Sequence, residues 1–469
     1  MELPNALDFT QIRERSLKAQ RTRVKLDPTN NQSAFNSNSL IQFRLPANVQ
    51  NTYMDWSNEW SLQFKFELKN IYTFAGVVTE TSLNLDKAGI SSIIKKVTFR
   101  QAGQVLSEIN DYGVLACIMK DLQVSQTHAG NTGALLEGTT VTAIGQQLDS
   151  TKTAQNVYTN WEGTFSIPLS YNCFANSNKM IPLFGLAPIE IDIELYPAYK
   201  VGGWNGKRDN ATPSLVIPDT AFELRDVMLT GYYVELSPNA QALIAQSVNN
   251  QYQISSNNWR VSNVVIEADA TSVNEIIPIN VSSLERVLIS HRKIVNETST
   301  TSTTAFTPCS LGNRYYPLLE QYQVFINGQP FPERPVKMTG KLAEAMTELL
   351  MTEHRLNDTN YSSNSFLADN QSSNSLYTVD NVYRLEHDGA TGLNTGIGSF
   401  LIGCNFSTLN VGISDSVFGG VSTIGSIVNY RGSYGAGGIG SQTELTFASE
   451  YECVLHLDMN STGVFVLNQ

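Results

Sequence analysis

Two stretches of the sequence share one pattern, KKVTFRQAGQVLSEI at residues 95–109 and EQYQVFINGQPFPER at residues 320–334. In each, apolar and polar residues alternate before a Gly-Gln pair, and a second short strand pattern follows that pair. The pair Asn327-Gly328 is a strong signal for a two-residue hairpin turn. Each predicted hairpin leads into one amphipathic helix. We interpret the two hairpin-helix units as copies of one duplicated domain.

The helices after the hairpins are predicted from apolar residues at i, i+3, i+4 and i+7. The apolar positions are Leu115, Ile118, Met119 and Leu122 in the first copy, and Leu342, Ala345, Met346, Leu349 and Leu350 in the second. A third helix is predicted to begin at Pro238, with Ser237 as its N-cap, and to end near Val248. Helical signals are few, and strand signals dominate the chain.

Strand signals flank both units in the same order. Before the units, LIQFRL (40–45) and LQFKFEL (62–68) compare with NEIIPI (274–279) and LERVLI (284–289). After them, IEIDIEL (189–195) and VMLTGYYVEL (227–236) compare with TELTF (443–447), YECVLHL (451–457) and GVFVL (463–467). Local hairpins combined with long returns favour a jelly-roll path over a meander. The predicted fold is all-β, with two tandem antiparallel eight-stranded jelly-roll sandwiches, a few short helices and long loops.

The predicted organisation has four parts: a basic N-terminal arm at 1–38, a first jelly roll at 39–248, a polar linker at 249–258 and a second jelly roll at 259–469. The linker, NNQYQISSNN, is low in charge and poor in apolar residues. Long segments rich in Gly, Ser, Thr and Asn are predicted to be loops that project from one end of the strands, at 126–160, 198–220, 296–317, 354–398 and 409–442.

The composition is unusual for its low charge. Charged residues make up 16% of the 469 residues, against roughly 25% in an average globular protein. A neutral, hydrogen-bonding surface can be buried against other subunits without leaving charges unpaired. No apolar segment resembles a signal peptide or a membrane span, and we expect reduced, intracellular synthesis. The five cysteines form no CxxC pair, and Cys117 and Cys453 are predicted to be buried free thiols.

The net charge of -12 argues against a protein that reads nucleic acid along its whole length. The exception is DFTQIRERSLKAQRTRVK at residues 8–25. Its cations are Arg13, Arg15, Lys18, Arg21, Arg23 and Lys25. One interpretation is a solvated, partly helical arm. The other is an arm that contacts an anionic surface, which would be packaged genome or lipid headgroups.

No catalytic residue, metal ligand or cofactor site is predicted. Glu190, Asp192 and Glu194 share one strand face, where they are expected to meet solvent or a basic row of a neighbouring subunit rather than perform glycosidase chemistry. Gly435, Gly437 and Gly440 match GxGxxG, but no helix pattern follows, so residues 431–441 are interpreted as a loop tip. The histidines lack metal-site spacing, and His456 is expected to be a satisfied strand residue.

At this level the chain resembles the double jelly-roll major capsid proteins of tailless icosahedral viruses, the lineage of adenovirus hexon and tectivirus capsid proteins. The stretches of sequence on which this resemblance rests are FRLPANVQNTYMDWSNEWSLQFKFEL (43–68), VTFRQAGQVLSEINDYG (97–113) and PLFGLAPIEIDIELYPA (182–198). The resemblance implies a structural protein of the virion capsid, assembled inside the host cell as trimeric, pseudo-hexameric capsomers. It implies as partners other copies of the chain, neighbouring capsomers, penton and minor capsid proteins, and an internal membrane or packaged genome through the arm.

Two other functions stay open at this point. One is a two-sandwich, glycan-acting hydrolase, in which Trp161, Trp204 and Trp259 would stack on sugars. The other is a spike or receptor-binding protein of the same kind of particle. The absence of a secretion signal and of paired carboxylates weighs against the hydrolase. Copy number in the virion separates a spike from a major capsid protein.

Overall fold

The protein is described here from a computed structural model. The model describes residues 19–468 except for several segments. The residues outside the description are 1–18, 47–48, 57–59, 72, 75–76, 79–80, 141–144, 155–156, 176, 178, 207–216, 249–250, 295–310, 313, 315–316, 318, 339–341, 354–384, 389–391, 396–399, 409–417, 436–438, 440–441, 459–463 and 469.

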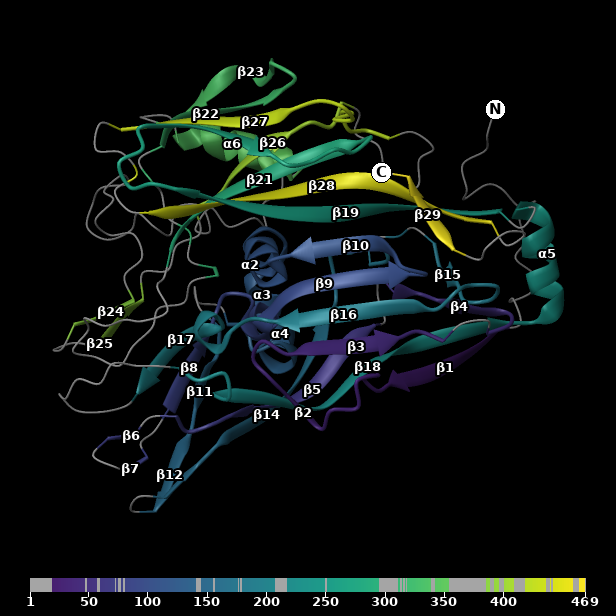
Figure 1. The fold of residues 1–469 in the computed structure, drawn as a ribbon, viewed down its shortest axis with the longest axis horizontal. Helices are drawn as coiled ribbons and strands as arrows, with labels where there is room; N and C mark the ends of the chain where they lie inside the picture. Colours follow the sequence, from purple (N-terminus) through teal and green to yellow (C-terminus); the bar gives the residue numbers. More distant parts are fainter. Residues whose placement is uncertain are drawn as a thin grey trace, which may run out of the picture.

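The first half of the chain forms two facing antiparallel sheets (Figure 1). One sheet has the order β14 (Trp161–Pro168), β5 (Ser61–Leu68), β18 (Phe222–Leu236), β4 (Thr52–Met54) and β15 (Ile181–Pro182), and both β1 (Ala19–Leu26) and β2 (Ala34–Asn36) also pair with β18. The other has the order β10 (Gln104–Asn110), β9 (Ile94–Gln101), β16 (Ile189–Leu195) and β3 (Leu40–Arg44). Alternate residues of both sheets point inward and form the core.

The second half repeats this arrangement. One sheet has the order β19 (Gln251–Ile266), β28 (Thr443–Asp458), β21 (Leu284–Lys293) and β26 (Ile402–Asn405), and β29 (Phe465–Asn468) also pairs with β28. The other has the order β20 (Ser272–Ile277), β27 (Val428–Tyr434), β22 (Leu319–Ile326) and β23 (Gln329–Lys337). Strands β10 and β19 lie side by side where the two halves meet (Figure 1).

The two halves match strand by strand. The order β3-β16-β9-β10 corresponds to β20-β27-β22-β23, and the order β2-β18-β5-β14 corresponds to β19-β28-β21-β26. The matched hairpins lead into α2 (Tyr112–Gln123) and α6 (Leu342–Thr352). This correspondence confirms the predicted fold of two tandem antiparallel jelly rolls. It also confirms the hairpin-helix unit as the feature that the halves share.

Aromatic residues fill the core of the first jelly roll at the turn between β4 and β5. The Trp56 and Trp60 rings stack with centroids 5.4 Å apart, and Phe99 meets Trp56 edge-on at 5.2 Å. The Trp56 indole N–H donates to the Leu169 carbonyl oxygen over 3.1 Å. Trp56 and Trp60 therefore pack in the core of the first jelly roll, and the buried indole N–H of Trp56 is satisfied.

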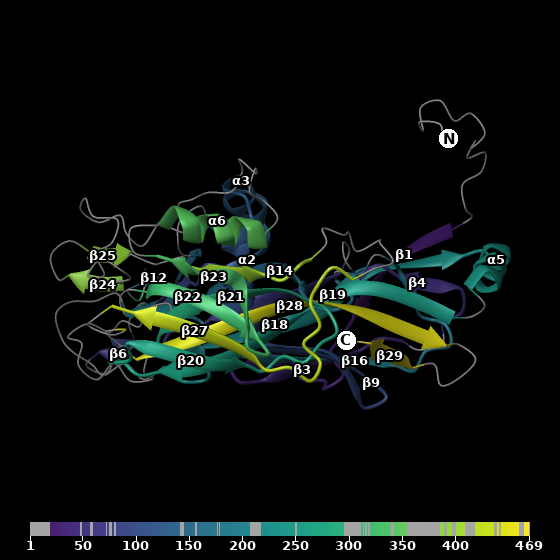
Figure 2. The same ribbon diagram turned by 90° about the horizontal axis from the view of Figure 1, so that it is seen from above.

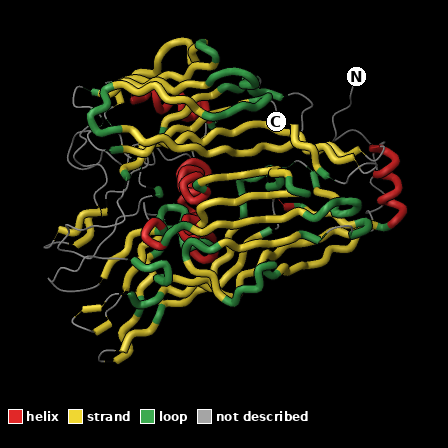
Figure 3. Tube along the Cα trace, in the orientation of Figure 1, coloured by secondary structure: helices red, strands yellow, loops and turns green. Residues whose placement is uncertain are grey.

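The remaining helices and strands are short. They are η2 (Gly89–Ile93), α3 (Gln126–Gly130), α4 (Thr132–Leu136), η3 (Ala198–Lys200), α5 (Pro238–Val248), β6 (Thr73–Phe74), β7 (Val77–Val78), β8 (Thr81–Leu85), β11 (Gln147–Asp149), β12 (Thr151–Ala154), β13 (Val157–Thr159), β17 (Gly202–Gly206), β24 (Leu385–Asp388) and β25 (Gly392–Thr395). Helix α5 has the predicted bounds. Strands β6, β7, β12, β24 and β25 gather at the end opposite α5 (Figure 1), and helices are few (Figure 3).

Helices α3 and α6 lie on the same side of the molecule (Figure 2). No helix within the described ranges is long and apolar enough to cross a membrane. The predicted loops at 126–160 and 198–220 contain short elements of their own, namely α3, α4, β11, β12 and β13 in the first and η3 and β17 in the second. The predicted loop at 354–398 lies mostly outside the described residues, as do residues 296–310 of another.

The predicted partner of IEIDIEL in the second half is wrong. The strand that matches it is β27, whereas TELTF and YECVLHL are two parts of the single strand β28, which matches β18. Strand β27 reads VNYRGSY and falls within the predicted loop at 409–442 and the predicted loop tip at 431–441. Gly432 interrupts its apolar face because a Cβ there would lie 2.6 Å from the Tyr430 hydroxyl oxygen. The pattern therefore has too few apolar residues to reveal a central strand.

The predicted linker is also wrong from Gln251 onward. Strand β19 begins at Gln251 and runs through the polar stretch to Ile266. Its small polar residues Ser256 and Asn258 are buried because they bond to the first jelly roll. The Ser256 hydroxyl donates to the Cys173 carbonyl oxygen, and the Ser107 hydroxyl donates to Asn258 Oδ1 over 2.8 Å. The remaining predicted domain boundaries stay predictions.

The two matched hairpin turns differ at the residue before the glycine. This difference predicts that exchanging the two residues changes the stability of the protein in opposite directions. Ala102 and Asn327 have φ of 48° and 50°, and the glycines after them have φ of 83° and 84°. Asparagine tolerates this left-handed conformation better than alanine, and both side chains are exposed. We expect Ala102→Asn to raise the free energy of unfolding by about 0.5–1 kcal/mol and Asn327→Ala to lower it by a similar amount. Urea denaturation measures both, and changes of the same sign would contradict the shared turn type.

Candidate functional site

The predicted basic arm is a strand in its described part. Arg13, Arg15 and Lys18 lie outside the described residues, while Arg21, Arg23 and Lys25 lie on β1. Strand β1 pairs with β18 from Ala19↔Leu236 to Leu26↔Leu229. The prediction of a partly helical arm is therefore wrong from Ala19 onward, and β2 pairs with β18 as well, although most side chains of β1 are exposed as a solvated arm requires. The backbone of β18 offers hydrogen bonds that the sequence of the arm alone does not reveal.

The three described cations share one exposed face. They occupy alternate positions of β1, so their side chains project to the same side at intervals of about 7 Å. The Arg21 guanidinium lies 4.0 Å from the centroid of the Tyr232 ring on β18, a cation–π contact. Val24 and Leu26 alternate with the cations and are half-buried. The site is an exposed basic surface on a paired strand, at the end of the molecule that carries α5 (Figure 1).

The acidic row on β16 pairs with cations of its own chain. Arg100 Nη2 lies 3.3 Å from Asp192 Oδ2, and the Gln42 side-chain amide donates to Asp192 Oδ1 over 3.0 Å. Lys95 Nζ lies 3.7 Å from Glu194 Oε2. Strand β9 therefore supplies the basic partners of Asp192 and Glu194, while β3 on the other side of β16 supplies the Gln42 amide. Glu190 is exposed, and the contact of this row with a basic row of a neighbouring subunit stays a prediction.

The tryptophans proposed for sugar stacking are mostly inside the cores. Trp204 and Trp259 are fully buried, and the Trp204 indole N–H donates to the Ala198 carbonyl oxygen over 2.8 Å. Trp161 packs against Phe165, with ring centroids 6.0 Å apart. The prediction that these rings could stack on glycans is wrong for Trp204 and Trp259, which ligands cannot reach.

Cys117 and Cys453 are buried free thiols, as predicted. Cys117, Cys173, Cys404 and Cys453 are free and buried, and Cys309 lies outside the described residues. Burial raises the pKa of the Cys453 thiol to about 12, with a further contribution from Glu452. Thiols in this state are poor nucleophiles. Within the described ranges, no group of three or more His, Cys, Asp or Glu side chains is placed to hold a metal ion.

Sequence reasoning missed His291, which is fully buried. His291 on β21 is enclosed by the Phe400 and Tyr434 rings, with centroids 6.1 Å and 5.9 Å away. Its Nε2 lies 3.0 Å from the Tyr434 hydroxyl oxygen. Burial lowers the pKa of His291 to about 3, so the imidazole is neutral at physiological pH. His456, which was predicted to be a satisfied strand residue, is half-buried on β28.

A buried ionic cluster joins the two jelly rolls. Asp86, next to η2, accepts hydrogen bonds from the backbone N–H groups of Leu311 and Gly312 of the second half, both over 3.0 Å. Asp121 on α2 pairs with Lys87 Nζ over 3.3 Å and with the Arg314 guanidinium. Lys87 and Arg314 are almost completely buried. Burial would raise the pKa of Asp121, but Lys87 and Arg314 hold it below its ordinary value.

Further contacts extend this junction along β10 and β19. The Asn263 side-chain amide donates to Asp111 Oδ2 over 2.5 Å, and the Phe465 backbone N–H donates to Gln101 Oε1 over 2.7 Å. The Phe174 and Phe465 rings pack with centroids 6.1 Å apart. No spacing rule in the sequence could have found these partners, because they lie on opposite halves of the chain. The halves are joined by specific, buried interactions rather than by a flexible linker.

Comparison with known proteins gives a consistent result. No protein-family model matches the chain, and no curated protein matches its sequence significantly. Among solved structures, a chain of the PBCV-1 virus capsid aligns with a TM-score of 0.57 and 12% identity over 98% of this chain and 99% of that one. The Sputnik virophage structure aligns with a TM-score of 0.56 and 10% identity over 100% of this chain and 92% of that one. The Faustovirus major capsid protein aligns with a TM-score of 0.52 and 10% identity over 94% of this chain and 91% of that one.

At these identities the alignments establish the fold. They span nearly the whole of each chain, so both jelly rolls and their order are included. The strand correspondence between the two halves leads to the same architecture independently. The chain therefore has the double jelly-roll fold of viral major capsid proteins.

Proposed function

We propose that the chain is the major capsid protein of an icosahedral virus and that it forms homotrimeric, pseudo-hexameric capsomers in the virion shell. The observation that carries this proposal is the alignment of nearly the whole chain with capsid proteins that share both jelly rolls. The hydrolase alternative gains no support, because Trp204 and Trp259 are buried and Asp192 and Glu194 pair with cations.

Two properties of the molecule suit a shell subunit. The surface has few charges for its size, so large areas can be buried against neighbours at low desolvation cost. The ionic cluster at Asp121 holds the two jelly rolls as one block, as a repeating unit of a lattice requires. We propose neighbouring capsomers, penton proteins and minor capsid proteins as its partners in the shell.

Light scattering on the purified protein tests the proposed assembly. We expect a mass three times the 51.7 kDa of the chain, or a larger multiple of that trimer. Negative-stain images should show particles with a pseudo-hexagonal outline. A stable monomer at high protein concentration would contradict the proposal.

We further propose that the basic surface of β1 contacts an anionic layer on the inner side of the shell. Arg21, Arg23 and Lys25 would act together with the preceding Arg13, Arg15 and Lys18. The support is the shared exposed face of the three described cations and its position on a paired strand. Packaged nucleic acid and anionic lipid headgroups both offer the phosphate groups that such a surface binds.

Binding of the assembled protein to duplex DNA and to vesicles with and without anionic lipid distinguishes the two sources. Replacing Arg21, Arg23 and Lys25 with glutamine should weaken binding to the true target. For DNA it should also reduce the slope of log affinity against log salt by about 0.9 per lost contact. A matched control replaces the exposed residues Arg334, Lys337 and Arg431 of the second jelly roll, which removes the same charge elsewhere. Equal losses in both variants would refute a specific role for β1.

A further inference from the structure

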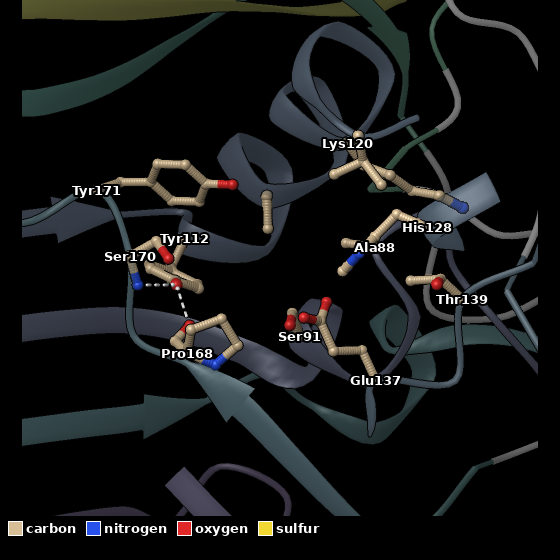
Figure 4. Close-up of a pocket in the computed structure, with 12 residues that line it drawn as sticks. Ala88, Ser91, Tyr112, Lys120, His128, Glu137, Thr139, Pro168, Ser170 and Tyr171 are labelled. Carbon is tan, nitrogen blue, oxygen red and sulfur yellow. Dashed lines mark hydrogen bonds between the residues drawn. The ribbon is translucent and has the colours of Figure 1, made fainter. Parts of the chain in front are cut away.

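A cavity of about 210 Å³ lies beside α2, and none of its lining residues belongs to the basic strand β1. Its walls come from η2, one face of α2, His128 of α3, the segment after α4 and the end of β14 (Figure 4). Cavities of this size hold small organic molecules. The side chains that decide its chemistry are Ser91, Tyr112, Lys120, Glu137 and Tyr171.

Glu137 presents its carboxyl group to this cavity (Figure 4). Its backbone is fixed, because its N–H donates to the Gly133 carbonyl oxygen over 2.8 Å and its own carbonyl oxygen accepts from the Ile90 N–H over 2.7 Å. Among the described residues the carboxyl group has no hydrogen-bond or ion-pair partner. Burial raises the pKa of Glu137 to about 7, and Lys120 partly offsets this rise.

Lys120 lines the same cavity but does not pair with Glu137. Its ammonium group donates to the Thr140 carbonyl oxygen over 3.3 Å. Burial lowers the pKa of Lys120, although Asp121 partly offsets this effect. Two groups of opposite charge therefore line one small cavity. Burial makes each of them costly to ionise, and they do not form an ion pair with each other. A ligand that pairs with both would recover the desolvation cost of each.

Two tyrosines form the apolar wall of the cavity. The Tyr112 hydroxyl donates to the Pro168 carbonyl oxygen over 3.3 Å and accepts from the Ser170 N–H over 3.0 Å, so its ring is held in place (Figure 4). The Tyr171 ring lies 5.9 Å from it. The Tyr171 and Ser91 hydroxyls have no hydrogen-bond partner within the described ranges. Aromatic walls beside a carboxylate are suited to an ammonium group.

We propose that this cavity binds a small zwitterion, whose ammonium group pairs with Glu137, whose anionic group pairs with Lys120 and whose short apolar body lies against Tyr112 and Tyr171. A simple amine would satisfy Glu137 but would be repelled by Lys120. A simple carboxylate would satisfy Lys120 but would be repelled by Glu137. The site is independent of the assembly proposal, because all of its walls belong to one jelly roll.

Three probes of matched length test the proposal on the full-length protein: 4-aminobutanoate, butylamine and butanoate. Titration calorimetry and ligand-observed NMR measure their affinities. We expect 4-aminobutanoate to bind at least about tenfold more tightly than either singly charged probe, since each charge-assisted hydrogen bond contributes about that factor. Equal affinities for the three probes would overturn the proposal, and so would no binding of 4-aminobutanoate by both methods.

Two variants separate the two charges. Glu137→Gln should reduce the affinity for 4-aminobutanoate by about tenfold or more, and Lys120→Met should do the same through the anionic end. Glu162→Gln is the matched control, because Glu162 is on β14 and pairs with Lys65 outside the cavity. Thermal melting checks that each variant is folded, and either folded variant suffices for the test. Unchanged affinity in a folded Glu137→Gln or Lys120→Met protein would refute the site.

Discussion

Asp121→Asn is expected to lower the free energy of unfolding by about 3–5 kcal/mol, because it leaves buried cations without their carboxylate. The side chains of Lys87 and Arg314 are 1% and 0% exposed, and both pair with Asp121. Asp86 cannot replace the lost charge, since its oxygens already accept from the backbone N–H groups of Lys87, Leu311 and Gly312. Urea denaturation of the purified variant measures the loss.

The same substitution at an exposed site provides the control. Asp269 is exposed and lies in the turn between β19 and β20, so Asp269→Asn should change the free energy of unfolding by less than about 0.5 kcal/mol. Arg314 belongs to the second half of the chain and Asp121 to the first. Asp121→Asn should therefore weaken the protection of backbone amides from hydrogen exchange in both jelly rolls. Hydrogen exchange that loosens only the first jelly roll would contradict the role of the cluster as their connection.

The buried His291 is expected to destabilise the protein in acid. Its pKa is about 6.5 when exposed and about 3 in the folded chain. The unfolded state therefore binds the proton first as pH falls, and stability is lost from pH 6.5 downward toward pH 3. Each pH unit in this window costs about 1.4 kcal/mol, which amounts to about 5 kcal/mol over the whole window.

Comparison with a His291→Gln variant isolates this contribution, because glutamine can still bond to the Tyr434 hydroxyl. Buried acids such as Glu285, whose pKa is raised to about 8 chiefly by burial and then by Glu450 and Glu452, act in the opposite direction. These acids are present in both the native chain and the variant, so their contributions cancel when the two free energies of unfolding are subtracted. The stability of the native chain should fall more steeply between pH 6.5 and pH 4 than that of the variant. Parallel curves would show that His291 does not titrate as its burial implies.

Local patterns were sufficient where local interactions decide the structure. Alternation predicted β5, β9 and β16, and i, i+4 spacing predicted α2 and α6, because these elements each bury one regular face. The hairpin turns followed from residues that tolerate positive φ. Strands β19 and β27 were missed, since their buried positions include Ser256, Asn258 and Gly432, which look like loop residues until their partners are known.

The candidate sites show the same division. The cations of β1 could be read from the sequence, but their common exposed face depends on pairing with β18, more than 200 positions away in the chain. The unpaired charges of Glu137 and Lys120 depend on how α2 and the segment after α4 pack together. Charge can be counted in a sequence, whereas burial and the presence of a partner are properties of the packed structure.

By itself, the sequence determined that this protein is a duplicated all-β chain with a hairpin and a helix at the centre of each half. Periodicity and turn chemistry act over a few residues, so they can be read directly. Only the tertiary structure decided how the halves are joined, through Asp86, Asp121 and Arg314, and which polar residues are buried. Those contacts link residues that are about 190 to 230 positions apart, and their energies arise only when folding removes water from both partners.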